Sequence, residues 1–219
     1  MIKYVIFDKD GTLLDTEPLF ERSWNEIGEK WGLKDIDKLY CRIIGRSRDT
    51  IIKLLEETYG PLVDCKAYYA ERMQRARELF EGEIPLKKGA VEILQFLREQ
   101  KIPVAVATST VMQIAEKNLK KTGLWEYVDT VVTSEMVENG KPAPDIFIEA
   151  GRRIGALQNS DECIVCEDSY NGIIGAHAAK MKPIMIPDML PPTEETDRLV
   201  YRTCRDLFEV IEIIKSEKV

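Results

Sequence analysis

The sequence predicts a doubly wound α/β fold, in which helices cover both faces of a parallel β-sheet. Five apolar segments are too short for helices and lack the polar–apolar alternation of a half-exposed strand. They are Tyr4–Phe7, Pro103–Ala107, Thr130–Thr133, Cys163–Cys166 and Pro183–Ile186. Helical patterns separate the later segments, and this alternation of strand and helix favours parallel strands joined by right-handed crossovers.

The helical patterns between and after the later strands end at recognisable positions. We expect helices at Ala90–Gln100, Gln113–Thr122, Ile146–Ile154 and Tyr170–Met181, and a last helix capped by Asp206. Gly123 and Gly155 directly follow two of them. Glycine is common just past the end of a helix, so these positions support the assignment.

The interval between the first two predicted strands breaks this alternation, because it holds helical patterns and no convincing strand. One apolar face recurs at intervals of four, three and four residues through Phe20, Trp24, Ile27 and Trp31. Ile51–Leu55 and Tyr68–Phe80 indicate two further helices. A chain of 219 residues fits one domain with an insertion. We therefore expect an all-helical insertion over residues 16–84 in a core formed by residues 1–15 and 85–219.

The composition and charge of the chain are those of a globular protein and disfavour nucleic-acid binding. Hydrophobic residues make up 44% and charged residues 32% of the sequence, as is usual for globular proteins. The 38 Asp and Glu outnumber the 31 Lys and Arg, so the net charge is −7. A nucleic-acid binder must neutralise phosphates, and this acidic chain has no long basic run.

No targeting signal is recognisable in the sequence. The apolar segment Tyr4–Phe7 is too short for the core of a signal peptide. The longest uncharged stretch, Ile102–Ala115, is shorter than the roughly 20 residues of a membrane span. Five scattered cysteines favour reduced thiols over a disulfide framework. We expect a cytoplasmic protein with no membrane partner, and nothing in the sequence requires more than a monomer.

Polar residues with complementary chemistry follow the first four predicted strands. In strand order they are Asp8 and Asp10, then Thr108, Ser109 and Thr110, then Lys141, and finally Glu167 and Asp168. Ligands of such sheets bind beyond the carboxyl ends of the strands, so we expect these side chains to share one site. Each feature alone is common in turns, helix caps or solvated surface, but their occurrence after successive strands favours a common function.

The chemistry of this set points to phosphoryl transfer. Clustered carboxylates repel one another and need a hard cation such as Mg²⁺, which would hold a phosphate oxygen. Hydroxyls, backbone amides at a helix start and the lysine would hold the remaining oxygens. One aspartate would attack phosphorus and another would move a proton.

The motifs resemble those of the haloacid dehalogenase superfamily. Phe7–Pro18 resembles its first signature, Thr108-Ser109 its second, Lys141 and its neighbours its third, and Glu167–Gly172 its fourth. The helical insertion at 16–84 resembles the small cap domain of the β-phosphoglucomutase-like branch. The resemblance spans nearly the whole chain, and it implies a Rossmann-like core, Mg²⁺ dependence and phosphoryl transfer through an aspartyl phosphate.

The resemblance also implies roles for individual residues. Asp8 would be the nucleophile, and Asp10 the acid that protonates the leaving oxygen and then the base that activates water. The implied metal ligands are Asp8, the backbone carbonyl of Asp10, Asp168 and, close by, Glu167. The implied phosphoryl-binding residues are Thr108, Ser109 and Lys141.

The superfamily contains phosphatases and a sugar-phosphate mutase, which the fold does not separate. Gly45–Arg48 resembles a mutase cap segment whose arginine grips a second phosphate, which makes Arg48 a candidate for binding a phosphorylated sugar. The hinge histidine of the mutase has no counterpart in Thr16–Phe20, and Val111-Met112 replaces its phosphate-contacting Lys–Asn pair. We therefore predict a Mg²⁺-dependent phosphatase for a small phosphorylated metabolite, with a mutase as the alternative.

A phospho-accepting receiver module is a remote alternative from a different class. Such modules also gather acids, a hydroxyl and a lysine around Mg²⁺ and a phosphorylated aspartate. Here the Asp8–Thr12 signature follows the first strand, the chain is too long, and a cap has no place in a receiver. Phosphate that persisted on Asp8 for minutes, without turnover of small esters, would favour this alternative.

Overall fold

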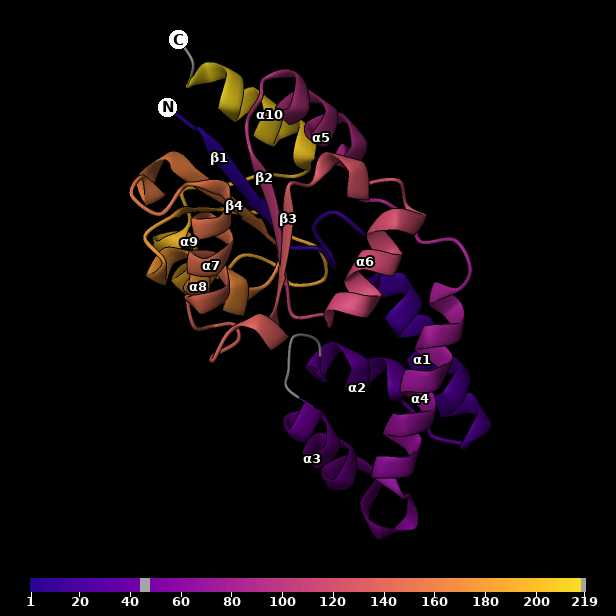
Figure 1. Ribbon diagram of the computed structural model, residues 1–219. Coiled ribbons are helices and arrows are strands. Elements are labelled where there is room, and N and C mark those ends of the chain that lie inside the picture. Colours follow the sequence, from indigo (N-terminus) through magenta and orange to yellow (C-terminus); the bar gives the residue numbers. More distant parts are fainter. Residues whose placement is uncertain (44–47, 218–219) are drawn as a thin grey trace. The chain divides into compact units, whose positions relative to one another are not determined.

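The computed structural model describes residues 1–43 and 48–217, which form two compact units (Figure 1). The sheet unit consists of Met1–Asp15 and Ile84–Val219, and the helical unit consists of Thr16–Glu83. The chain therefore leaves the sheet unit after its first strand and returns to it before the second.

Within the described residues, a parallel sheet of six strands forms the centre of the sheet unit, in the order β3-β2-β1-β4-β5-β6. The strands are β1 (Tyr4–Phe7), β2 (Val104–Thr108), β3 (Thr130–Thr133), β4 (Cys163–Glu167), β5 (Lys182–Met185) and β6 (Arg202–Thr203). The chain runs outward from β1 to β3 on one side and from β4 to β6 on the other. This order confirms the predicted doubly wound, Rossmann-like fold, and its switch point lies between β1 and β4.

The central strands are buried, which explains their continuous apolar sequences. The side chains of Val5–Phe7 are 0% exposed, and every residue of β2 and β4 is buried. Parallel pairing aligns Phe7 with Val106 of β2 and with Cys166 of β4. The pairing continues one residue further, where the Asp8 amide donates to the Cys166 carbonyl at 2.9 Å. The segments that follow these three strands therefore emerge together at one sheet edge.

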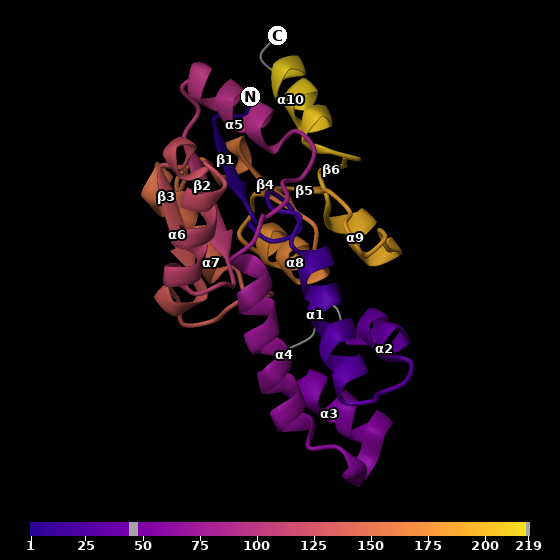
Figure 2. The same ribbon diagram turned by 90° about the vertical axis from the view of Figure 1, so that its right-hand side faces the viewer.

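Helices connect the strands and cover the sheet (Figure 2). They are α5 (Ala90–Glu99), α6 (Met112–Lys121), α7 (Asp145–Ile154), α8 (Tyr170–Ala178), α9 (Glu194–Leu199) and α10 (Leu207–Ser216). Short 3₁₀ turns lie at Trp125–Tyr127, Ser134–Met136 and Ser160–Glu162. Phe147 of α7 and Ala176 of α8 belong to one apolar cluster with Ile6 and Val165 of the sheet. On another side, α5 and α10 pack against each other near the two termini.

The helical unit contains α1 (Glu17–Lys30), α2 (Ile36–Ile43), α3 (Arg48–Tyr59), a 3₁₀ turn (Gly60–Leu62) and α4 (Cys65–Phe80). An aromatic core holds these helices together. The ring of Trp24 lies 5.6 Å from the ring of Tyr68 and 6.3 Å from that of Tyr40, measured between centroids. The Tyr68 hydroxyl also donates to the Trp24 carbonyl at 3.1 Å, so this buried polar group is satisfied.

The predicted strands and helices of the sheet unit are present, with ends that differ by a few residues. Three elements, α2, α9 and β6, are not predicted from the sequence. For α2 a signal existed, because Ile36, Leu39 and Ile43 have helical spacing and are buried. The short α9 is marked only by a capping box between Thr193 and Thr196. The two residues of β6 are exposed, so no apolar run reveals that strand.

The two connections between the units are paired inside the sheet unit. Leu14 and Leu86 form an antiparallel bridge. The Asp15 amide donates to the Pro85 carbonyl at 2.9 Å, and the Lys87 amide donates to the Leu13 carbonyl at 3.0 Å. The outgoing and returning segments therefore form a two-stranded neck, residues 13–15 and 85–87.

None of the helices in residues 1–43 and 48–217 has both the length and the apolar character that crossing a bilayer requires.

Candidate active site

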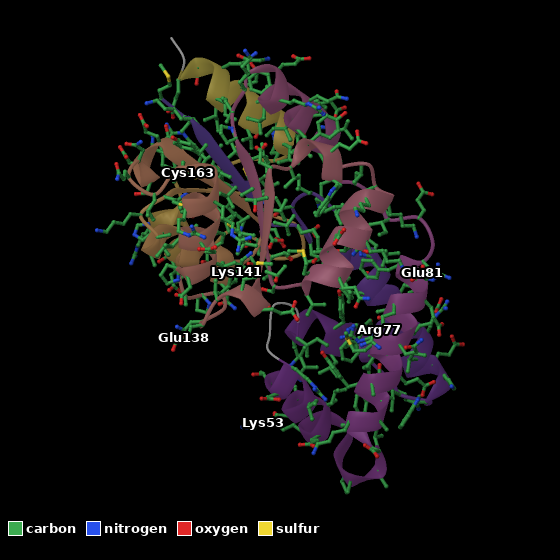
Figure 3. The ribbon with its side chains drawn as sticks, viewed as in Figure 1. Lys53, Arg77, Glu81, Glu138, Lys141 and Cys163 are labelled. Carbon is green, nitrogen blue, oxygen red and sulfur yellow. The ribbon has the colours of Figure 1, made fainter. Side chains whose placement is uncertain are left out.

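Lys141 joins the ends of three neighbouring strands. It lies between β3 and α7 and is labelled in Figure 3. Its Nζ is 2.5 Å from Oδ1 of Asp8, which follows β1, and 2.5 Å from Oε1 of Glu167, which ends β4. It also donates to the backbone carbonyl of Ala107 in β2 at 3.0 Å. Three residues that the sequence analysis assigns to the site are thus in direct contact.

Asp168 packs against the turn that follows Asp8. The Thr12 hydroxyl lies 3.4 Å from Oδ1 of Asp168. Gly11 has a φ of +82°, and a Cβ atom at this position would lie 2.4 Å from Oδ2 of Asp168. Glycine is therefore required here both for the backbone conformation and for the space that the carboxylate fills.

The carboxylate of Asp10 is held at both oxygens. Its Oδ1 accepts a hydrogen bond from Nζ of Lys9 at 2.6 Å, and its Oδ2 accepts one from the Thr110 hydroxyl at 2.7 Å. No role is predicted for Lys9 from the sequence, and Thr110 is expected at the site only as one of the hydroxyls after the second strand. The position of Lys9 between the two aspartates was the one sequence feature that could have indicated its contact with Asp10. For Thr110, that feature was its place in the run of hydroxyl residues after the second strand.

Thr108 and Ser109, both predicted to bind phosphoryl groups, have different surroundings. Thr108 ends β2 with 1% exposure, and its Oγ1 accepts a hydrogen bond from the Thr110 amide at 3.1 Å. Ser109 is exposed, and its carbonyl accepts a hydrogen bond from the Ser134 hydroxyl at 3.1 Å. The loop that follows β2 is thereby fixed at its start by Thr108 and held by a hydrogen bond from Ser134, which directly follows β3.

Glu167 is anchored at the start of α8. Its Oε2 accepts hydrogen bonds from the Ser169 amide at 2.9 Å and the Ser169 hydroxyl at 2.8 Å. Ser169 also caps α8 by accepting a hydrogen bond from the Gly172 amide at 3.0 Å. A Cβ atom at Gly172 would lie 1.8 Å from Cδ of Glu167, so only glycine leaves room for this carboxylate.

The electrostatics of the cluster show an excess of buried negative charge. Burial raises the pKa of Asp8 to about 7; Lys141 opposes this, while repulsion from Glu167 and Asp10 adds to it. Burial likewise raises the pKa of Asp168 well above its ordinary value, with added repulsion from Glu167 and Asp8. Burial alone would lower the pKa of Lys141, but Asp8 and Glu167 raise it above its ordinary value. The ammonium groups of Lys141 and Lys9 are thus insufficient to neutralise the four carboxylates.

The predicted metal ligands are only partly arranged for a cation. Over residues 1–43 and 48–217, no three His, Cys, Asp or Glu side chains are grouped as a metal site. Lys141 and Ser169 occupy the oxygens of Glu167, and Lys9 and Thr110 occupy those of Asp10. The chemistry of the set nevertheless fits a hard cation, because its donors are all oxygens and its carboxylates repel one another.

Arg48, the predicted substrate-binding residue of the insertion, is exposed at the start of α3. Its guanidinium lies 5.8 Å from the centroid of the Tyr69 ring, within the range of a cation–π contact. The rest of the predicted segment, Gly45–Ser47, lies outside the described residues.

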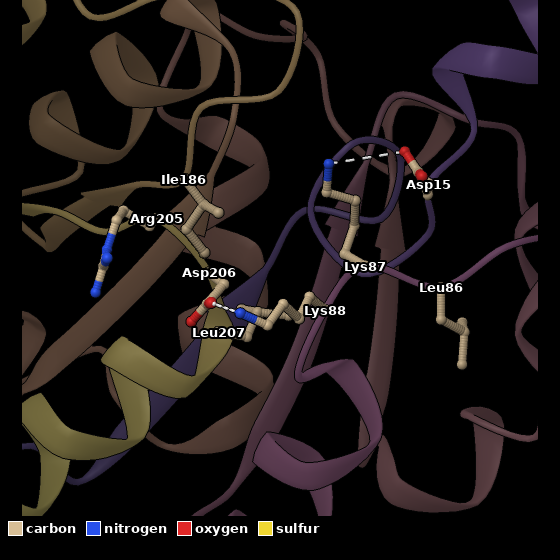
Figure 4. A pocket seen from close by; sticks show the side chains of 8 residues that line it. All are labelled: Asp15, Leu86, Lys87, Lys88, Ile186, Arg205, Asp206 and Leu207. Atoms are coloured by element: carbon tan, nitrogen blue, oxygen red, sulfur yellow. Dashed lines mark hydrogen bonds and ion pairs between the residues drawn. The ribbon is translucent and has the colours of Figure 1, made fainter.

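A cavity of about 510 Å³ lies elsewhere in the sheet unit (Figure 4). It is lined by Asp15, Leu86, Lys87, Lys88, Ile186, Arg205, Asp206 and Leu207. Its cations already have carboxylate partners: Lys87 pairs with Asp188 at 2.8 Å, and Lys88 with Asp206 at 2.7 Å. The lining includes none of the four clustered carboxylates, so this cavity is distinct from the candidate site.

Residues 5–186 match the family described as haloacid dehalogenase-like hydrolase. The chain belongs to this family. Its curated relatives include a probable pseudouridine-5'-phosphatase of Drosophila melanogaster, 32% identical over 200 residues, which cover 89% of this chain and 86% of the relative. They also include a phosphorylated carbohydrates phosphatase of Thermotoga maritima, 30% identical over 181 residues, which cover 82% of each chain.

The haloacid dehalogenase-like fold is also found in a solved β-phosphoglucomutase of Clostridium difficile. That structure aligns with 100% of this chain and 99% of its own, with a TM-score of 0.75. At 20% identity the likeness concerns the fold alone. It confirms the predicted α/β fold.

Proposed function

We propose that this haloacid dehalogenase-like hydrolase is a Mg²⁺-dependent phosphatase that hydrolyses a small phosphate monoester, with phosphorylated sugars as its substrate class. The buried cluster of Asp8, Lys141 and Glu167 carries the proposal, because it presents a carboxylate nucleophile beside a fixed ammonium group. The names of the two curated relatives, both phosphatases, support the same reaction.

In the proposed first step, an oxygen of Asp8 attacks phosphorus. The bond between phosphorus and the leaving oxygen breaks, and Asp10 gives that oxygen a proton. In the second step, Asp10 takes a proton from water, which attacks the aspartyl phosphate and regenerates Asp8 with release of inorganic phosphate. Lys141, Thr108 and Ser109 bind the phosphoryl oxygens, since positioning and neutralisation of charge supply most of the rate.

Mg²⁺ would be held by Asp8, Asp168 and the backbone carbonyl of Asp10, with Glu167 nearby. When bound, it neutralises charge on the carboxylates and on the phosphoryl group. The raised pKa values of Asp8 and Asp168 support this assignment, because they show that the cluster lacks positive charge. Glu167 contributes mainly by holding Lys141.

We also propose that residues 16–84 act as a cap that selects the substrate, with Arg48 binding a distal anionic group. The proposed location is the cytoplasm, which suits the buried free thiols of Cys65, Cys163, Cys166 and Cys204. The proposed active form is a monomer, because none of the proposed roles requires a residue from a second copy.

The test is a screen of phosphorylated sugars and other small phosphates with the purified protein and Mg²⁺. Free phosphate and isomerised sugar phosphate are scored separately, with Asp8→Asn as the inactive control. Release of phosphate supports a phosphatase, whereas isomerisation without release supports the mutase, whose fold this chain shares. Failure to act on any ester would overturn both.

A further inference from the structure

Lys9 lies between the two aspartates of the first motif and is almost completely buried. Its side chain is 1% exposed, and its Nζ is 2.6 Å from Oδ1 of Asp10. Its backbone is fixed as well, because its carbonyl accepts hydrogen bonds from the Leu13 amide at 3.1 Å and the Leu14 amide at 2.9 Å. A buried ammonium needs a partner, and Asp10 supplies it.

The two oxygens of Asp10 differ in the partners they have. An ammonium group can only donate hydrogen bonds, so Oδ1 can contact Lys9 only as an acceptor. A hydroxyl can donate or accept, so Thr110 can contact Oδ2 whether or not that oxygen carries a proton. A protonated carboxyl oxygen keeps acceptor capacity but loses its charge, so the contact with Lys9 is strongest when the transferred proton is carried on Oδ2.

We infer that Lys9 is a positioning residue for Asp10, which holds Oδ1 and leaves Oδ2 as the oxygen that exchanges the proton with the substrate. This inference rests on the proposed phosphatase function, in which Asp10 protonates the leaving oxygen. Lys9 touches neither substrate nor phosphoryl group in this role. It acts through the orientation of the Asp10 carboxylate.

The consequence is a dependence of the rate on the leaving group. Without Lys9 the carboxylate can rotate, and fewer bound molecules present a proton to the leaving oxygen. An ester whose alcohol leaves only after protonation then reacts more slowly, whereas 4-nitrophenolate leaves without that help. A purely structural role for Lys9 would slow all esters alike.

The experiment compares wild type and Lys9→Met on 4-nitrophenyl phosphate and phenyl phosphate, with Mg²⁺ present. We expect kcat/KM to fall about tenfold or more for phenyl phosphate and less than about threefold for 4-nitrophenyl phosphate. Lys88→Met is the matched control, since it removes an exposed lysine paired with Asp206 in the same unit. Equal losses on both esters with Lys9→Met, or no loss on either, would overturn the inference.

A crystal structure of the wild type with Mg²⁺ and inorganic phosphate keeps the inference testable if Lys9→Met does not fold. We expect Nζ of Lys9 on one oxygen of Asp10 and the other oxygen directed at phosphate. A lysine that has left Asp10 would contradict the inference. Asp10→Asn separates it from the proposed function: if that variant shows the leaving-group dependence and Lys9→Met does not, only the inference fails.

Discussion

The two units bury a cation in different surroundings. In the sheet unit, Lys141 lies between the carboxylates of Asp8 and Glu167. In the helical unit, Arg72 is 5% exposed and packs against the rings of Trp24 at 4.5 Å and Tyr69 at 5.0 Å. Among the described residues, no hydrogen-bond partner faces its Nε. The first cation organises a charged site, whereas the second serves packing.

The pKa directions show the same difference. Burial lowers the pKa of both side chains, but the two carboxylates around Lys141 outweigh burial and raise it. Around Arg72 burial prevails, and its pKa is lowered. Loss of the first cation should therefore affect the reaction, and loss of the second should affect only the stability of the helical unit.

The largest effect is expected for Asp8→Asn. The amide cannot form the covalent intermediate, so phosphate release should fall by a factor on the order of 10⁴ or more. The unfolding temperature should not fall, because the change removes a buried charge. Phosphate release and thermal unfolding measure the two effects. Turnover near that of the wild type would refute the assigned nucleophile.

Removal of the metal should also abolish the activity, in this case reversibly. EDTA should stop phosphate release, and added Mg²⁺ should restore it. Activity that survives exhaustive chelation would contradict the proposed metal dependence.

The stabilisation by Mg²⁺ should depend on pH. Because the folded-state pKa of Asp8 is raised from 3.8 to about 7, its ionisation opposes folding increasingly as the pH rises through this interval. Mg²⁺ should offset this cost, so its effect on the unfolding temperature should be larger at pH 7.5 than at pH 5. Equal shifts at both pH values would argue that the cation binds elsewhere.

Lys141→Met should lower kcat/KM by a factor of about 10² to 10³, because a fixed charge on the phosphoryl group is lost. It also leaves Asp8 and Glu167 facing each other without a cation. We therefore expect a lower unfolding temperature in EDTA, with partial recovery in Mg²⁺. Thermal unfolding under the two conditions tests this, and a variant as stable as the wild type in EDTA would weaken the role assigned to Lys141.

Arg72→Met should have the smallest effect. The lost cation–π contacts and the relieved burial of a charge offset each other, so the free energy of unfolding should change by about 1 kcal/mol or less. Turnover of 4-nitrophenyl phosphate should stay near that of the wild type. A hundredfold loss of turnover would show that Arg72 takes part in the reaction.

The clustering of the candidate site residues was predictable from sequence where the backbone of the sheet positions the residue. Asp8 and Glu167 sit at the ends of adjacent buried strands, and Lys141 reaches them from the next loop, so motif order along the chain was sufficient. The hydrogen-bond partners of Asp10 were less predictable, because the contacts of Lys9 and Thr110 depend on side-chain directions that the spacing of residues does not specify.

In the helical unit, the positions of α1, α3 and α4 were predictable, but the contacts of their side chains were not. Its apolar faces indicate helices, and the aromatic core around Trp24 and Tyr68 explains the spacing. The contact of Arg72 with Trp24 and Tyr69 could not be foreseen, because an arginine on a helix is usually solvated. Which side chains of this unit would meet a substrate depends on surface shape, which the periodicity of a helix does not encode.

The central position of β1 has a consequence for how the chain folds during synthesis. β1 lies near the N-terminus, but its neighbours β2 and β4 begin only at Val104 and Cys163. The middle of the sheet therefore cannot assemble until β4 has left the ribosome, and pairings between segments this far apart in sequence favour slow folding. The helical unit is continuous in sequence and is synthesised before β2 and β4. It can therefore fold first, while β1 is still unpaired.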